Sequence, residues 1–281
     1  MKVKIVVVIS QTQDTEAKIS VASSGDAIDT SSMKWVLNPY DEFAIEEALR
    51  IKEKFGGEVT LVTMGPARVV EAIRTGLAMG ADSAVHIKDD SFGSSDNYAI
   101  GKVIASEIKK LDEYDLVFTG FKIIDQESVQ VGVHIAEELG LPHVALVSKI
   151  IQIDPDQKRI TCQKEIDGGH VVVEVPLPAL ITCPDGMNEP RYASLPGIMK
   201  AKKKPLKEVT INDIDLSAIG LSVEDLGKGG SRVKTINIRV PQIERKLKII
   251  TGKDNPMVKG SEVKESAHEL LRLLREEAKV I

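Results

Sequence analysis

Strand and helix patterns alternate along the first two thirds of the chain. Residues 3–9 form a run dominated by valine and isoleucine, which is typical of a strand buried on both faces of a sheet. Residues 42–55 carry apolar side chains at helical spacing and end at two glycines, which favour a helix stop. Further strands are expected at residues 59–64, 83–87, 115–119 and 143–147, and further helices at residues 67–79, 96–111 and 128–139. This alternation predicts right-handed βαβ units, and therefore an α/β fold with a doubly wound, mostly parallel sheet.

The pattern changes to short alternating strands after residue 147. Two of them flank an Asp-Pro-Asp-Gln turn at residues 154–157, and a third follows a Gly-Gly turn at residues 167–169. These segments predict an antiparallel hairpin extension on one side of the sheet. The strands expected in this region are residues 149–153, 159–163, 170–175 and 179–182.

The last third of the chain has weaker signals. Residues 200–204 form a basic cluster, and the residues that follow show little periodicity. Residues 261–278 carry one stripe of apolar side chains, which predicts an amphipathic helix. A tail with so little core of its own is expected to pack on a partner. We expect an α/β domain at residues 1–183, a loop segment at residues 184–205 and an extended C-terminal arm ending in a helix at residues 206–281.

Composition narrows the class of protein. The 281 residues carry 37 basic and 42 acidic side chains, and a net charge of −5 argues against a nucleic-acid partner. No apolar run is long enough to span a bilayer, and the apolar N-terminus lacks the small-residue cleavage site of a signal peptide. The two cysteines match no metal spacing, so we expect no metal and a reducing, cytoplasmic location.

The search for catalytic side chains is negative. The sequence contains no Walker A loop, no G-x-S-x-G elbow and no H-E-x-x-H motif. The five histidines are scattered, and each is better explained as a structural or surface residue. We therefore expect no catalytic residue, and any chemistry must come from a bound cofactor.

Several loops follow strands whose carboxyl ends should meet at one edge of the sheet. Ser10 follows the first strand and Met64 ends the second. Gly120 enters a loop that leads to Ser128 and Gln130 at a helix N-terminus, where backbone N–H groups can bind phosphate. On spacing alone, a nucleotide site and the ordinary turns of an α/β protein explain these residues equally well.

Four segments resemble one known family in the right order. They are residues 37–48 (LNPYDEFAIEEA), residues 73–82 (IRTGLAMGAD), the hairpin at residues 164–182 and residues 188–204 (NEPRYASLPGIMKAKKK). They resemble motifs of the electron transfer flavoprotein β subunit, and the C-terminal residues 273–281 are similar to its FixA-type branch. The resemblance covers nearly the whole chain and implies a fold like that of the adenine nucleotide alpha hydrolases.

The resemblance also implies a cofactor pocket and a partner-binding segment. Leu195 would be an apolar anchor for dehydrogenase partners, because the flanking prolines lower the cost of ordering the segment. The alternative explanation of Leu195 is that it lies at the tip of a loop that packs on its own subunit. The implied partner-binding residues are Arg191, Tyr192, Leu195, Pro196, Ile198, Met199 and Lys200. The implied cofactor-binding residues are Val8, Ser10, Asn38, Met64, Asp96, Gly120, Phe121, Lys122, Ile123, Ile124, Asp125, Ser128, Gln130 and Val131.

Two versions of this family differ in the nucleotide that they bind, and both pair with an α subunit that holds the main FAD. We favour the electron-bifurcating version, because residues 91–96 and the C-terminal tail resemble it. Such a subunit binds a second FAD, oxidises NADH and sends electrons toward a ferredoxin-like protein and a quinone-linked dehydrogenase. It would reach a membrane only through a partner subunit. The alternative binds structural AMP and receives electrons from acyl-CoA-type dehydrogenases.

Two readings from other classes share this fold. One is a nucleotide-binding module of the universal-stress type, which needs only about half this length and has no use for the Leu195 loop. The other is a stand-alone hydrolase, which the lack of a phosphate-binding glycine cluster disfavours. The sequence departs from the flavoprotein pattern at Ser10, where a lysine is usual, at the bulkier Phe121 and Ile123, and at Val171, where an acidic residue is usual.

Overall fold

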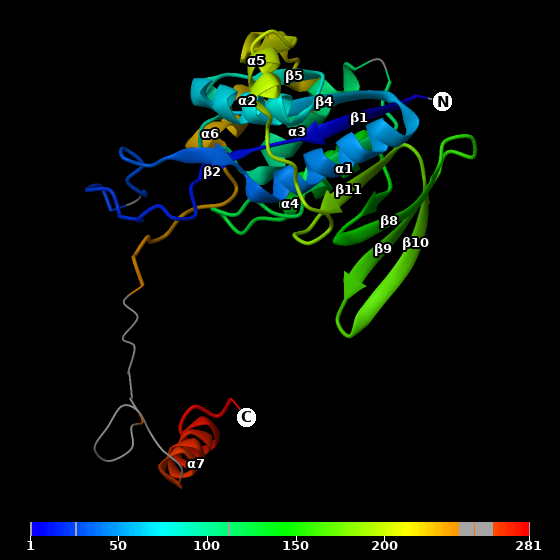
Figure 1. Ribbon diagram of the computed structural model, residues 1–281. Coiled ribbons are helices and arrows are strands. Elements are labelled where there is room, and N and C mark those ends of the chain that lie inside the picture. Colours follow the sequence, from blue (N-terminus) through cyan, green and yellow to red (C-terminus); the bar gives the residue numbers. More distant parts are fainter. Residues whose placement is uncertain (1, 26, 112, 242–249, 251–260, 281) are drawn as a thin grey trace. The chain divides into compact units, whose positions relative to one another are not determined.

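A parallel sheet forms the centre of the first of two structural units, Met1–Ile238 and Arg239–Ile281 (Figure 1). The computed structural model describes residues 2–25, 27–111, 113–241, 250 and 261–280. In this part of the chain, seven strands pair in the order β12-β5-β4-β1-β6-β11-β7. β1 (Val3–Val8) pairs in parallel with β4 (Gly57–Met64) on one side and with β6 (Leu116–Gly120) on the other. The doubly wound parallel sheet is therefore confirmed.

Helices cover both faces of this sheet. Ile5 and Val7 point to the face covered by α1 (Pro39–Phe55) and α2 (Val70–Met79), whereas Val6 and Val8 point to the face covered by α3 (Asn97–Lys109) and α4 (Gln130–Leu139). This double burial explains why the first strand is almost entirely apolar. The other strands of the sheet are β5 (Ser83–Ile87), β7 (His143–Val144), β11 (Ala179–Cys183) and β12 (Leu206–Val209).

Helix ends follow local signals. α1 begins three residues before its predicted start, because Pro39 occupies the first helical position, where its missing N–H costs nothing. α3 begins at Asn97, where the Asp96 side chain accepts a hydrogen bond from the Ala99 N–H at 3.0 Å. α4 ends at Gly140, which takes the left-handed conformation with φ 64°. Most predicted boundaries lie within two residues of the observed ones.

Three of the strands predicted for the antiparallel extension form a separate small sheet, whereas the fourth, at residues 179–182, is part of β11 and pairs in parallel with β6 and β7 in the main sheet. β8 (Val147–Asp154), β9 (Arg159–Ile166) and β10 (Gly169–Pro176) pair with one another in the order β10-β9-β8 (Figure 1). In the described residues, no ladder joins them to the parallel sheet, so this extension stacks beside the sheet and does not widen it. Ile160 and Cys162 on the inner face are buried in the main apolar cluster, which explains the stacking.

The sequence patterns missed several short elements. β2 (Gln11–Gln13) and β3 (Trp35–Leu37) form a small antiparallel pair, and β12 adds a parallel edge strand next to β5. Residues after β12 also join the core, since Ile214, Leu216 and Leu221 are buried. The short helices are α5 (Leu195–Ala201), α6 (Gly227–Gly230), and the 3-10 turns Ala67–Val69, Asp90–Phe92, Ile211–Asp213, Ser217–Ile219 and Val223–Asp225.

The second unit contains α7 (Ser261–Glu276), which matches the predicted terminal helix to within two residues. Its Arg272 forms ion pairs at 2.8 Å with Glu269 and Glu276 on the polar side. Val263 and Leu270 are exposed apolar residues of the same helix. Across the described residues, no helix is both long and apolar enough to cross a bilayer.

Candidate functional site

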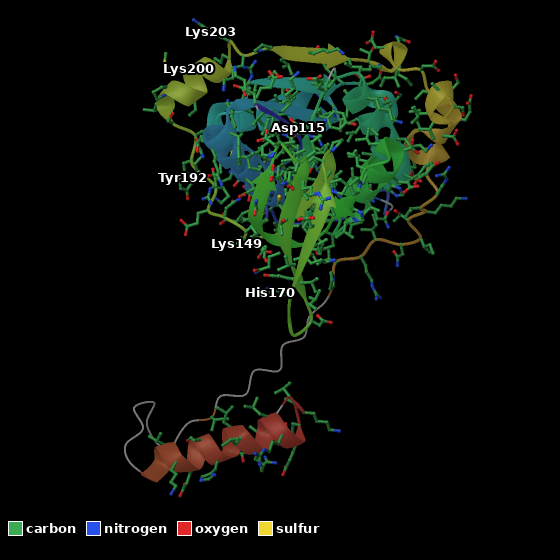
Figure 2. All side chains as sticks on the ribbon, turned by 90° about the vertical axis from the view of Figure 1, so that its right-hand side faces the viewer. Asp115, Lys149, His170, Tyr192, Lys200 and Lys203 are labelled. Atoms are coloured by element: carbon green, nitrogen blue, oxygen red, sulfur yellow. The ribbon has the colours of Figure 1, made fainter. Side chains whose placement is uncertain are left out.

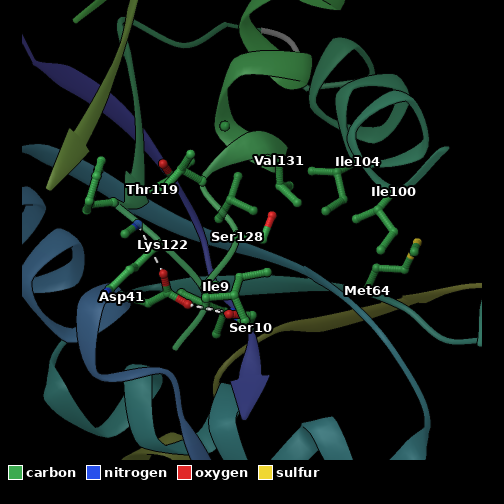
Figure 3. A pocket seen from close by; sticks show the side chains of 16 residues that line it. Ile9, Ser10, Asp41, Met64, Ile100, Ile104, Thr119, Lys122, Ser128 and Val131 are labelled. Atoms are coloured by element: carbon green, nitrogen blue, oxygen red, sulfur yellow. Dashed lines mark hydrogen bonds between the residues drawn. The ribbon is translucent and has the colours of Figure 1, made fainter. Parts of the chain in front are cut away.

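A cavity of about 630 Å³, including its open mouth, lies at the carboxyl ends of β1 and β6 (Figure 3). β1 connects to β4 on one side of the sheet and β6 lies on the other, so the cavity is at the topological switch point. This is the position at which open α/β sheets bind ligands. The lining residues are Val8, Ile9, Ser10, Asp41, Met64, Ile100, Ile104, Thr119, Gly120, Phe121, Lys122, Ile123, Ser128, Val129, Val131 and Gly132.

Asp41 joins the two strands that form the floor of the cavity. It lies in the first turn of α1 and is only 4% exposed. One carboxylate oxygen accepts hydrogen bonds from the Ser10 N–H at 2.7 Å and the Ser10 hydroxyl at 2.8 Å. The other accepts from the Gly120 N–H at 3.0 Å. Burial raises the pKa of Asp41 from 3.8 to about 7, although the hydrogen bonds from Ser10 act in the opposite direction.

The wall opposite Asp41 is apolar. Ile100 and Ile104 project from α3, and Met64 lies beside them at the end of β4 (Figure 3). Val131 adds a further apolar side chain from the first turn of α4. A flat apolar ring, such as the base of a nucleotide, suits such a wall.

The polar side of the cavity lies between β6 and α4. The buried Thr119 hydroxyl has no hydrogen-bond partner among the described residues. Gly132 lets α4 approach it closely, because a Cβ at this position would lie 2.9 Å from Thr119 Oγ1. The backbone N–H groups of the first turn of a helix are left free to bind an anion. An adenine nucleotide fits this combination of a free hydroxyl, a helix N-terminus and an apolar wall.

Asn38 shapes the loop between β6 and α4 from behind. Its side chain is buried, donates to the Lys122 carbonyl oxygen at 3.0 Å and accepts from the Ile124 N–H at 3.3 Å. The Lys122 ammonium pairs with Glu127 in the same loop. Asn38 therefore holds the loop in place instead of lining the cavity.

Besides Asn38, four predicted cofactor residues lie outside the lining. The carboxylate of Asp96 caps α3 at the Ala99 N–H. Gln130 is exposed at the start of α4, and Asp125 is exposed in the loop before it. Ile124, held by Asn38, is half-buried. The predicted cofactor residues that the fold does bring together around the cavity are Val8, Ser10, Met64, Gly120, Phe121, Lys122, Ile123, Ser128 and Val131.

Sequence reasoning found Met64 and Val131 of the apolar wall but missed its α3 part. The lining residues that it missed are Ile9, Asp41, Ile100, Ile104, Thr119, Val129 and Gly132. Asp41 stands in the Asn-Pro-Tyr-Asp segment, and an acidic residue in the first turn of a helix usually signals only a favourable helix dipole. Ile100 and Ile104 belong to the buried stripe of an amphipathic helix, and such a stripe does not indicate which positions border a cavity.

Comparison with known proteins gives the family. The electron transfer flavoprotein domain model matches residues 27–214. The chain is 39% identical to electron transfer flavoprotein subunit beta of Bacillus subtilis (strain 168) over 276 residues, which cover 98% of each chain. The chain belongs to the electron transfer flavoprotein β-subunit family. It is also 38% identical to protein FixA of Azotobacter vinelandii over 241 residues, covering 84% of each chain. The mitochondrial β subunit of Arabidopsis thaliana is 35% identical over 254 residues, with 88% of this chain and 100% of that protein covered.

In this β subunit, the predicted partner-binding segment is an exposed apolar surface. Tyr192, labelled in Figure 2, is 97% exposed and lies before the short helix α5. Leu195 is 79% exposed and is the first residue of that helix. Ser194 caps that helix by accepting from the Gly197 N–H at 3.1 Å. Pro196 occupies the second position of α5. Ile198, Met199 and Lys200 continue the exposed side.

Arg191 differs from its neighbours, because its side chain turns back onto α1. The guanidinium donates to Glu46 at 2.7 and 3.1 Å and to Glu53 at 2.5 and 3.2 Å. Burial alone would raise the pKa of Glu46, but the hydrogen bonds from Arg191 and Arg50 bring it below its usual value. The side chain of Arg191 thus fastens the segment to the domain.

Proposed function

We propose that this chain is the nucleotide-binding half of an electron transfer flavoprotein and pairs with an α subunit that holds the main FAD. The observation that carries the proposal is the cavity at the switch point between β1 and β6, with the unpartnered Thr119 hydroxyl at its polar side. The exposed apolar residues Tyr192 and Leu195 would contact a dehydrogenase partner. The amphipathic α7 and the arm that carries it would pack on the α subunit.

The cavity would hold the adenylate part of a second FAD. The side chains of Ile100 and Ile104 suit the adenine ring, and the Thr119 hydroxyl is a donor for a ribose or phosphate oxygen. The first turn of α4 would place its backbone N–H groups against a phosphate. Asp41 would fix the distance between the ends of β1 and β6, and the end of β6 carries Thr119.

A bound FAD would supply two-electron oxidation of NADH and one-electron transfer toward a ferredoxin-like protein and, through the α subunit, a quinone-linked dehydrogenase. The residues of this chain would orient the cofactor and exclude water from it. Residues 91–96, which resemble the bifurcating branch, lead directly into α3, the helix that supplies the apolar wall. This position supports FAD as the ligand, because the segment that resembles the bifurcating branch sets the start of the helix that lines the cavity.

Structural AMP is the second candidate. One observation favours it: the cavity, at about 630 Å³ including its open mouth, is of a size that suits a mononucleotide. In that case the complex would pass electrons from acyl-CoA-type dehydrogenases through the α-subunit flavin only.

Extraction of the bound nucleotides from the purified αβ heterodimer separates these possibilities. Two FAD per heterodimer and bleaching of the flavin absorbance by NADH are expected for the bifurcating complex. One FAD and one AMP, without reduction by NADH, would support the second candidate. A heterodimer without nucleotide in the β subunit, or a chain that forms no complex and carries no flavin, would contradict both.

A further inference from the structure

A segment that follows the edge strand β12 returns to the start of α3. Residues 221–232, here called the strap, bury Leu221 and Leu226 in the same apolar cluster as Phe92. The Gly227 N–H of the strap donates to Ser95 Oγ at 2.8 Å. The strap is therefore fastened to the turn at residues 91–96 by both burial and hydrogen bonding.

Asp96 joins the end of the strap to the first turn of α3. One carboxylate oxygen accepts from the Ala99 N–H at 3.0 Å, and the other accepts from the Arg232 N–H at 2.7 Å. The Arg232 guanidinium lies 3.7 Å from the centre of the Tyr98 ring, a cation–π contact with the same turn. Since both oxygens of Asp96 are occupied by protein donors, this carboxylate holds protein segments and does not reach into the cavity.

The same turn of α3 holds the rim of the nucleotide cavity. The Asn97 side chain donates to Ser128 Oγ at 2.7 Å and to Gln130 Oε1 at 3.4 Å. Ser128 lines the cavity, and α3 contributes Ile100 and Ile104 to the opposite wall. A shift of the first turn of α3 would therefore move both the wall and the rim.

We propose that Asp96 and Arg232 are positioning residues for the nucleotide cavity, because the strap fixes the turn of α3 from which Asn97 holds Ser128. This inference rests on the proposed function, since the ligand concerned is the nucleotide of that cavity.

Two substitutions remove the hydrogen bond between the strap and α3. Asp96→Asn keeps one oxygen for the Ala99 N–H but places an NH₂ group against the Arg232 N–H. Arg232→Pro removes the N–H itself together with the guanidinium that contacts the Tyr98 ring. Ser231, at φ −59° and ψ 127°, already has a conformation suited to the residue before a proline. Lys234→Ala, at an exposed cation just beyond the strap, is the matched control.

The dissociation constants of AMP and FAD are measured by calorimetry on the nucleotide-depleted αβ heterodimer. Asp96→Asn and Arg232→Pro should each raise the constant of the bound nucleotide about tenfold, the factor that one hydrogen bond to a charged group carries. Lys234→Ala should leave it unchanged. If Asn97 transmits the effect, Asp96→Asn should add little in a chain that already carries Asn97→Ala.

Amide hydrogen exchange of the nucleotide-free heterodimer tests the positioning role without a ligand. Both strap variants should speed exchange at residues 97–101 and 128–132 while exchange in β1 and β4 stays slow. Unchanged exchange at residues 128–132, or wild-type nucleotide affinity in both variants, would overturn the inference. If the wild-type heterodimer binds neither AMP nor FAD, the proposed function fails, and the exchange at residues 128–132 still decides the positioning role.

Discussion

Ser10 donates both its backbone N–H and its hydroxyl to a single oxygen of Asp41, at 2.7 and 2.8 Å. The other carboxylate oxygen accepts from the Gly120 N–H, so one side chain of α1 holds the ends of β1 and β6. The flavoprotein pattern usually has a lysine at the position of Ser10, whereas in this chain the donors to Asp41 at that position are neutral. The carboxyl group is therefore buried without a cation among its hydrogen-bond donors, and its pKa is raised to about 7.

This raised pKa predicts a pH dependence of stability. Between pH 4 and pH 7 the folded state binds more protons at Asp41 than the unfolded state, whose pKa is near 3.8. The contribution of Asp41 to the free energy of unfolding should therefore be greatest below pH 4. It should fall as the pH rises to about 7, by at most about 1.4 kcal/mol per pH unit. Urea unfolding of the heterodimer at several pH values measures it, and Asp41→Asn should flatten this part of the profile. Parallel wild-type and variant profiles would contradict the prediction.

Gly132 predicts a steric effect on nucleotide binding. A Cβ at this position would lie 2.9 Å from Thr119 Oγ1, so Gly132→Ala must move α4 or the hydroxyl. We expect the nucleotide dissociation constant to rise about tenfold, which corresponds to a packing cost of roughly 1.4 kcal/mol. Gly169→Ala is the matched control, because nothing lies within 4 Å of a Cβ there. Equal affinities of the two variants would show that α4 does not approach the ligand.

The Arg191 contacts predict a stability effect on the partner-binding segment. Arg191→Gln removes the ion pairs with Glu46 and Glu53, but the nearly buried Glu46 keeps Arg50 as a partner. We expect a loss of about 1–3 kcal/mol in the free energy of unfolding. Arg159→Gln removes an exposed ion pair with Glu174 and should cost no more than about 1 kcal/mol.

Faster amide exchange at residues 191–200 should accompany the Arg191→Gln change, because the segment loses its attachment to α1. If exchange there stays slow, Ser194 and the packing of α5 suffice to hold the segment.

The exposure of Leu195 predicts that its substitution changes the KM for a dehydrogenase partner and no other step. Leu195→Ala removes an exposed apolar side chain, whose full burial in an interface contributes about 1.5–3 kcal/mol. The KM for a dehydrogenase partner should therefore rise about tenfold or more, while reduction of a small dye by the same heterodimer stays unchanged. Ile151→Ala, an exposed apolar residue on β8, is the control. A change in dye reduction would place Leu195 near the flavin instead of at a docking surface.

Much of the fold could be predicted because its signals are local. β1 can be recognised in the sequence by its run of apolar residues, which are buried on both faces. α1 can be recognised by Pro39 at its start and Gly56 at its end. β12 was not predicted because the exposed Lys207 and Glu208 separate its two apolar residues and hide the strand pattern. Its pairing with β5 depends on a partner more than 100 residues earlier in the chain.

The site was predictable only along the strand-end loops. Ser10, Met64 and Gly120 could be found because the carboxyl ends of parallel strands converge. Asp41 and Ile104 reach the cavity through space from helices, and no spacing in the sequence relates them to those loops. Asp96 shows the reverse error, since a residue expected at the ligand instead has both oxygens bound to protein donors.

β5 gains its outer neighbour only from residues 206–209, which follow every other strand of that sheet in the chain. During synthesis, β5 therefore keeps an open row of backbone N–H and C=O groups until most of the polypeptide has left the ribosome. Such an edge is a template for pairing with other chains. The nascent chain therefore presents the β5 edge until residues 206–209 pair with it, and the short β12, with the charged Lys207 and Glu208, then forms the edge of the sheet.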